Sequence, residues 1–146
     1  MLRKTMSINT TELTDLWRKV TIQWKKQLEK YCAKLGITYV DRLIIDEIYK
    51  NKSLTKKELA IILFAEPQSL TRSIKRINNA GLLISRNDKN DMRFVTYTLT
   101  PKGIEIANQI EERTNQLWGK VLKGIPDKNL AAFEKSLIHI LSNFTE

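Results

Sequence analysis

The sequence predicts a mostly α-helical fold with one small β-hairpin, an α+β arrangement, in a single domain of 146 residues. Two observations carry this prediction. Apolar residues recur at intervals of three or four over several long stretches, which is the pattern of helices that bury one face. Between residues 82 and 99, two short runs of strand-forming residues instead flank a polar turn, which is the pattern of a hairpin.

The N-terminal third of the chain predicts two helices. The first spans residues 11–35, where apolar residues follow the helical interval, and Gly36 ends it. The second begins after Thr38 and fades near Asn51. Asp41 stands three residues after Thr38, so hydroxyl and carboxylate can each satisfy a free backbone amide in a capping box.

The middle of the chain predicts a short helix and then a longer one. Thr55 and Glu58 repeat the capping-box spacing at the start of a helix through residue 63. Pro67 suits the first turn of a helix over residues 67–80, where its missing N–H costs nothing, and Gly81 ends that helix.

The helix over residues 67–80 divides sharply around its circumference. Its apolar stripe is Leu70, Ile74 and Ile77. The opposite side, which we call the polar face, consists of Gln68, Ser69, Thr71, Arg72, Lys75, Arg76 and Asn79. Residues 67–87 contain no Asp or Glu, although a solvated helix usually mixes both signs of charge. The polar face is therefore expected to bind an anion.

A hairpin follows, with strands at residues 82–86 and 93–99 and a turn between them. Thr100 then caps a helix that has Pro101 at its first position and runs to Gly124, and Pro126 opens the last helix. Two short helices, the second with a basic polar face, followed by a hairpin predict a winged helix-turn-helix. The major groove of B-DNA admits one such helix, and a basic hairpin can reach the adjacent minor groove. An ordinary helix packed beside a hairpin is the alternative interpretation.

Composition limits the partners. The net charge of +9, from 25 Lys and Arg against 16 Asp and Glu, favours a polyanion. No stretch approaches the ~20 apolar residues of a membrane span, and the N-terminus lacks the apolar core of a signal peptide, so a cytoplasmic protein is expected. Cys32 is the only cysteine and cannot form an internal disulfide.

The hairpin region resembles the MarR/SlyA family of transcriptional regulators. The residues that carry the resemblance are Gly81-Leu82-Leu83, Arg86, Asp88, Asp91-Met92-Arg93 and Leu99-Thr100-Pro101-Lys102-Gly103, and Ser69-Leu70-Thr71-Arg72 resembles the start of that family's DNA-reading helix. The likeness is close over residues 55–103. Two departures are Ser85, where the family often has arginine, and Phe64-Ala65, in a turn that commonly contains glycine.

The resemblance implies a homodimer on double-stranded DNA, with one winged helix-turn-helix lobe per chain at residues 38–103 and dimerisation helices at residues 8–36 and 101–146. The long apolar stripes of the terminal helices, with Trp17, Trp24, Trp118, Phe133 and Phe144, are compatible with it, although they could also close a monomeric bundle. Two lobes would meet half-sites about 10 base pairs apart in an inverted repeat.

The expected DNA contacts come from the polar face and the hairpin. They are Gln68, Ser69, Thr71, Arg72, Lys75, Arg76, Arg86, Asp91 and Arg93. The family analogy places Arg93 in the minor groove, with Asp91 holding its guanidinium through a bidentate pair. Asp91 could instead be a simple turn residue.

Family analogy also implies that a small aromatic or phenolic ligand releases the DNA, and Trp17, Trp24, Tyr39 and Tyr49 could line its cleft. Cys32 is interpreted as a buried small hydrophobe, with redox sensing as the alternative. The sequence contains no phosphate-binding glycine loop, spaced metal ligands or catalytic constellation, so neither an enzyme nor a cofactor is expected. A winged-helix module that binds protein or RNA is the other alternative.

Overall fold

The computed structural model describes residues 8–91 and 93–145. The chain divides into two compact units, Met1–Arg113 and Thr114–Glu146, which we describe separately. In chain order the elements are α1 (Thr10–Lys34), α2 (Tyr39–Asn51), β1 (Leu54–Thr55), α3 (Lys56–Ile62), α4 (Pro67–Asn79), β2 (Leu83–Asn87), β3 (Val95–Leu99), α5 (Pro101–Val121) and α6 (Asp127–Asn143). No helix in the described ranges is long and apolar enough to cross a membrane.

The predicted helix starts are confirmed by their caps. Capping boxes begin α2 at Thr38 and α3 at Thr55, with both reciprocal bonds present in each. Pro67 occupies the first turn of α4. The Thr100 hydroxyl accepts from the backbone N–H of Gly103 at 3.0 Å in the first turn of α5. Local sequence therefore sets where these helices begin.

Three helices of the first unit end in the same way. After α4, Gly81 has a φ of 75°, its N–H donates to the carbonyl of Asn78, and the N–H of Leu82 donates to that of Ile77. These two bonds form a Schellman cap, which needs a left-handed residue and satisfies the last free carbonyls. Gly36 closes α1 with the same pair of bonds. After α3 the left-handed residue is Phe64.

Phe64 is the residue of the Schellman cap where glycine is preferred, because a left-handed conformation costs a bulky residue about 1–2 kcal/mol. Its φ is 52° and its ring is 85% exposed. We expect Phe64→Gly to raise the free energy of unfolding by about 0.5–1 kcal/mol, the strain relieved less the entropy cost of glycine. Phe64→Ala is the matched control, since it removes the same exposed ring but keeps the strained φ. Equal urea midpoints for the two variants would contradict the assignment of strain.

The sheet has three strands in the order β1-β3-β2, all antiparallel, whereas the sequence predicts only the hairpin. Leu54 and Thr55 pair with Tyr97 and Thr96. Strand β2 begins and ends one residue later than predicted and β3 begins two residues later, whereas the end of the hairpin at Leu99 is as predicted. Leu82 is still part of the helix cap, and the Asp91 carboxylate accepts from the N–H of Arg93, which keeps Arg93 in the turn.

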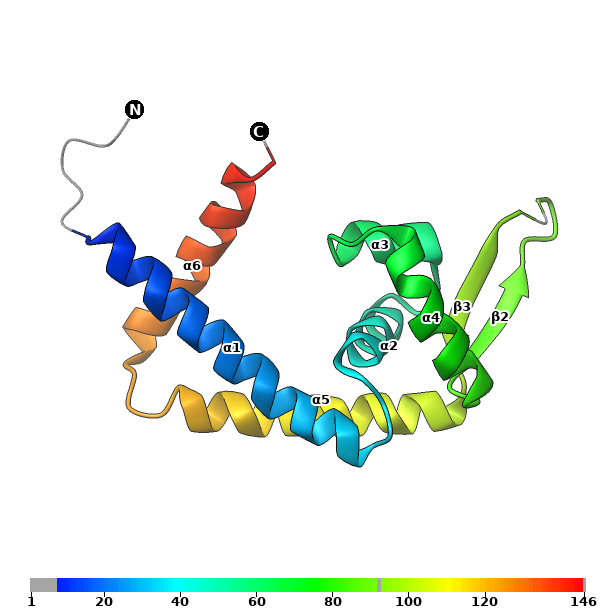
Figure 1. Ribbon diagram of the computed structural model, residues 1–146, viewed down its shortest axis with the longest axis horizontal. Helices are drawn as coiled ribbons and strands as arrows, with labels where there is room; N and C mark the ends of the chain where they lie inside the picture. The colour runs from blue at the N-terminus through cyan, green and yellow to red at the C-terminus, as the bar shows by residue number, and fades with distance from the viewer. Residues whose placement is uncertain (1–7, 92, 146) are drawn as a thin grey trace. The chain divides into compact units, whose positions relative to one another are not determined.

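The core of the first unit lies among α2, α3, α4 and the sheet, and it also takes residues from α1 and α5. Its most deeply buried members are Leu28, Cys32, Ile44, Ile45, Ile48, Leu59, Ile77, Ala107 and Ile110. In Figure 1, α4 lies beside the hairpin with α2 and α3 next to it. The predicted stripe of α4 is confirmed, since Leu70, Ile74 and Ile77 are all buried.

The second unit contains the end of α5 and all of α6. None of the α6 residues is buried. Five large apolar side chains of α6 and its C-cap are between 46% and 81% exposed, namely Phe133, Ile138, Ile140, Leu141 and Phe144. Exposed apolar side chains of this size, gathered on one element, are typical of a surface that another chain covers.

Candidate nucleic-acid interface

The polar face of α4 is exposed in full. Gln68, Ser69, Thr71, Arg72, Lys75, Arg76 and Asn79 all lie at the surface, and the first turn of the helix carries no acidic residue. Arg72 and Lys75 form no ion pair within the described residues. Cationic and amide donors therefore lie in one row on a rigid element, as groove reading requires.

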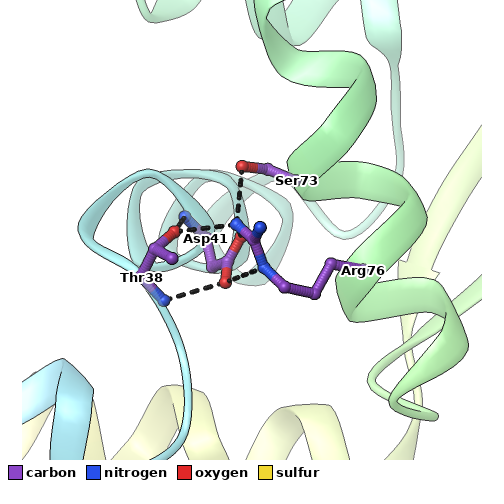
Figure 2. A network of polar contacts seen from close by, with 4 residues as sticks. All are labelled: Thr38, Asp41, Ser73 and Arg76. Atoms are coloured by element: carbon purple, nitrogen blue, oxygen red, sulfur yellow. Dashed lines mark hydrogen bonds and ion pairs between the residues drawn. The ribbon is translucent and has the colours of Figure 1, made fainter.

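Arg76 differs from its neighbours because its guanidinium is engaged within the protein (Figure 2). Its Nε donates to one carboxylate oxygen of Asp41 at 3.0 Å, and its Nη2 donates to the other at 2.6 Å. Nη2 also contacts the hydroxyls of Thr38 at 3.0 Å and Ser73 at 3.2 Å. Two of the three guanidinium nitrogens of Arg76 are thus hydrogen-bonded within the protein. The sequence predicts Arg76 as a DNA contact, but these two nitrogens are not free to make one.

Asp41 is fully buried, whereas the Arg76 side chain is 40% exposed. Burial opposes ionisation of Asp41, but hydrogen bonds from Arg76 and Thr38 outweigh it, and the pKa of the carboxyl lies below its ordinary value. Sequence reasoning identified Asp41 only as a helix cap. Its second bond partner lies 35 residues away, and no local pattern indicates it.

The lowered pKa of Asp41 predicts how its contribution to stability depends on pH. When the pKa of a carboxyl is lower in the folded than in the unfolded protein, the ionised carboxylate stabilises the fold at pH values above the unfolded-state pKa of about 4. This stabilisation is lost as the pH falls through the pKa of the folded protein. Asp41→Asn should therefore lower the urea midpoint at pH 7, and the gap to the unaltered protein should narrow below about pH 4. A gap that is the same at pH 7 and pH 3 would contradict an ionised Asp41.

The wing is the hairpin β2–β3 with its connecting turn. Asp91 and Arg93 form the expected bidentate pair, in which Nε donates to Oδ1 at 3.0 Å and Nη2 to Oδ2 at 2.8 Å. Bonds from the side chain and backbone of Arg93 lower the pKa of Asp91. The Arg93 side chain is 88% exposed, and Arg86 on β2 is also exposed. Met92, which belongs to the wing motif, lies outside the described residues.

A groove of about 240 Å³ lies where the polar face meets α3 and the sheet. Its lining residues are Lys56, Thr71, Ile74, Lys75, Asn78, Ser85 and Tyr97. Lys56 is a member that sequence reasoning missed, and its Nζ lies 3.4 Å from the Thr71 hydroxyl. A lysine in the first turn of a helix is unfavourable, because its positive charge opposes the helix dipole. This unusual position of Lys56 was the signal in the sequence that could have identified it.

The four aromatic residues predicted to line a ligand cleft are not gathered at this groove. Tyr39 is half-buried with Lys25 and Arg42 within 5.6 Å of its ring centre, and the Tyr49 hydroxyl donates to Asn108 at 2.8 Å. Trp17 is 50% exposed and Trp24 is half-buried. Within the described residues, no three or more His, Cys, Asp and Glu side chains are grouped to hold a metal ion.

Cys32 is 1% exposed, and burial raises the pKa of its thiol. Its interpretation as a buried small hydrophobe is confirmed. A reactive cysteine needs access to solvent and a pKa low enough to give the thiolate. Cys32 is buried and its pKa is raised, so it meets neither condition.

Known proteins share this architecture over most of the chain. The family described as "Transcriptional regulator SarA/Rot" matches residues 18–110. The multiple antibiotic resistance protein MarR of Salmonella typhimurium is 30% identical over 115 residues, covering 78% of this chain and 80% of that protein. The organic hydroperoxide resistance transcriptional regulator of Bacillus subtilis is 31% identical over 86 residues, 59% of this chain and 56% of its own length.

A solved structure extends the likeness to a DNA complex. A single-residue mutant of MarR from E. coli, complexed with operator DNA, superposes with a TM-score of 0.80 at 25% identity, covering 94% of this chain and 99% of that one. The family and the Bacillus subtilis relative are described as transcriptional regulators, and the E. coli structure shares the fold. The chain thus belongs to the SarA/Rot family within the MarR-type winged-helix transcriptional regulators.

Proposed function

We propose that this regulator binds double-stranded DNA in a sequence-specific manner, with α4 as the recognition helix in the major groove and the wing against the adjacent minor groove. The observation that carries the proposal is the exposed, acid-free polar face of α4 beside a wing whose Arg93 is oriented by Asp91. In this arrangement Gln68, Ser69, Thr71 and Arg72 read base edges, and Lys75 and Arg86 contact phosphates.

We assign residues 38–103 to the DNA-binding lobe and residues 8–36 and 101–146 to dimerisation. Support comes from the apolar side chains that the terminal helices leave exposed, including Leu13, Leu16, Trp17 and Val20 in α1, each at least 50% exposed. A homodimer would cover them and present two recognition helices to an inverted repeat with half-sites about 10 base pairs apart. Sedimentation equilibrium tests the dimer, and a monomer at micromolar concentration would refute it.

A small aromatic or phenolic effector that releases the DNA is the remaining part of the proposal. Tyr39 supports it, because Lys25 and Arg42 lie within 5.6 Å of the centre of its half-buried ring, and cationic groups beside an aromatic ring attract an aromatic anion. Benzoate and phenol, added to the DNA complex, are the probes. Unchanged binding at millimolar concentrations of both would exclude effectors of this class.

The binding experiment is a gel shift on the DNA that flanks the coding region of this protein, at two salt concentrations, with duplex RNA as the control. A shifted DNA complex that weakens as salt rises is expected, because phosphate contacts release counterions. Duplex RNA hides its bases in a deep, narrow groove, so a reading helix gains little there. Equal binding of both duplexes would instead favour a non-specific electrostatic surface.

Arg93→Ala should weaken binding to nearly all duplexes and lower the slope of log affinity against log salt by about one unit. The physical reason is that Arg93 contributes one cationic contact without reading a base in the major groove. A salt titration by fluorescence anisotropy measures both quantities. Lys89→Ala is the control and should have the smaller effect, because Lys89 lies in the same turn but forms no ion pair within the part of the chain that the structure describes. If affinity and slope are unchanged in Arg93→Ala, Arg93 does not contact DNA.

A further inference from the structure

We propose that Arg76 is a positioning residue and not a phosphate ligand. Together with Asp41 it sets the orientation of the recognition helix, and through that orientation it affects how well the helix discriminates between bases. This inference rests on the proposed DNA-binding function. It differs from the sequence-based expectation, which placed Arg76 among the direct contacts on the polar face.

The geometry of the pair favours an internal role. The planar fork of Arg76 engages both oxygens of Asp41, at 2.6 and 3.0 Å, and Asp41 has no exposed surface. If Arg76 turned to a phosphate, it would leave a buried carboxylate without its counter-charge, which is strongly unfavourable. A phosphate contact made at the surface in exchange would be screened by salt. The pair should therefore persist in the DNA complex.

The position of the pair explains what it controls. Thr38 and Asp41 form the capping box of α2, so Arg76 connects α4 to the first turn of another helix (Figure 2). Ser73, one turn earlier on α4, is buried against the same guanidinium. We infer that this contact, together with the buried apolar stripe, constrains the rotation and tilt of α4, while Arg72, one turn before Arg76, stays exposed. Base reading requires side chains held near their productive geometry by such supporting bonds.

Charge offers a test that separates positioning from direct contact. The charge of Arg76 is balanced by Asp41, whereas its neighbour Lys75 forms no ion pair within the described residues. The double variant Asp41→Asn/Arg76→Gln has the same net charge as the unaltered protein and keeps similar side-chain shapes. Any change in its salt dependence therefore reports a lost phosphate contact and not a changed overall field.

The experiment uses the full chain and two duplexes, one recovered from a randomised pool by the unaltered protein and one with the same bases scrambled. Fluorescence anisotropy gives the affinity for each duplex and the salt slope on the scrambled one. We expect the double variant to keep its salt slope. Its ratio of affinities for the selected and the scrambled duplex should fall about tenfold, which is the effect of one mismatched base pair. Lys75→Gln, the matched control, should lose about one unit of slope and keep its preference.

Arg76→Lys supplies an independent readout, because an ammonium group keeps the charge but cannot span both carboxylate oxygens. We expect Arg76→Lys to lose base preference as the double variant does. If circular dichroism shows that the double variant does not fold, Arg76→Lys takes its place in the test. A slope that falls by about one unit in the double variant would overturn the inference and make Arg76 a phosphate ligand. Full preference in Arg76→Lys would overturn it as well, because the two-pronged bond to Asp41 would then not be needed for base reading. If the unaltered protein itself prefers no duplex, the proposed function fails first, and this role for Arg76 fails with it.

Discussion

Replacing Gly103 by alanine is expected to lower the free energy of unfolding by about 1–3 kcal/mol, the usual cost of overpacking. A β-carbon at Gly103 would overlap the backbone carbonyl oxygen of Leu82 and would lie 3.3 Å from the β-carbon of Leu99. The Leu82 carbonyl cannot easily move, because it accepts the backbone N–H of Thr100 at 3.0 Å. The strain therefore acts on the junction of α4, the sheet and α5.

Glu105→Ala is the matched control for this substitution, since Glu105 is exposed in the same part of α5 and alanine suits a helix. Its effect should remain within a few tenths of a kcal/mol. Urea unfolding followed by circular dichroism at one fixed protein concentration measures both variants, because any dimer makes the midpoint depend on concentration. Equal midpoints for Gly103→Ala and the unaltered protein would show that the sheet can shift away from the start of α5.

Those parts of the fold that depend on neighbouring residues could be predicted from the sequence. The capping residues Thr38, Thr55 and Thr100 act on amides within three positions, so their spacing is sufficient evidence of a helix start. The division of α4 into an apolar stripe and a polar face follows in the same way from the helical period. The pair of Asp91 and Arg93, two residues apart, was implied by the family resemblance and not by local rules, and the structure has it.

Features that depend on long-range contacts could not be predicted in this way. Strand β1 has only two residues, and it exists because Leu54 and Thr55 meet β3 about 40 residues later. The bond between Arg76 and Asp41 likewise needs α2 and α4 to pack together first. Helical periodicity places Arg76 on the polar face beside Lys75, but only the packed structure shows that its charge is directed to a buried carboxylate.

Arg72→Ala is expected to change which bases the protein prefers, besides weakening binding to the best duplex by roughly fivefold to a hundredfold, the value of one good bidentate contact to a base pair. Arg72 lies in the N-terminal half of α4, which is the part of a recognition helix that faces base edges. It is exposed and makes no ion pair within the described residues, so its guanidinium is free to meet the two acceptors of a guanine.

Selection from a randomised duplex pool, carried out in parallel with both proteins, measures the change in preference. The Arg72→Ala pool should lose its preference at one position of each half-site and keep it elsewhere, because a missing side chain affects only the base pair that it contacts. Lys75→Ala is the control, since loss of a phosphate contact should weaken binding uniformly and leave the selected sequence unchanged. If Arg72→Ala selects the same sequence with the same strength at every position, Arg72 is a backbone contact, and base reading must come from Gln68, Ser69 or Thr71.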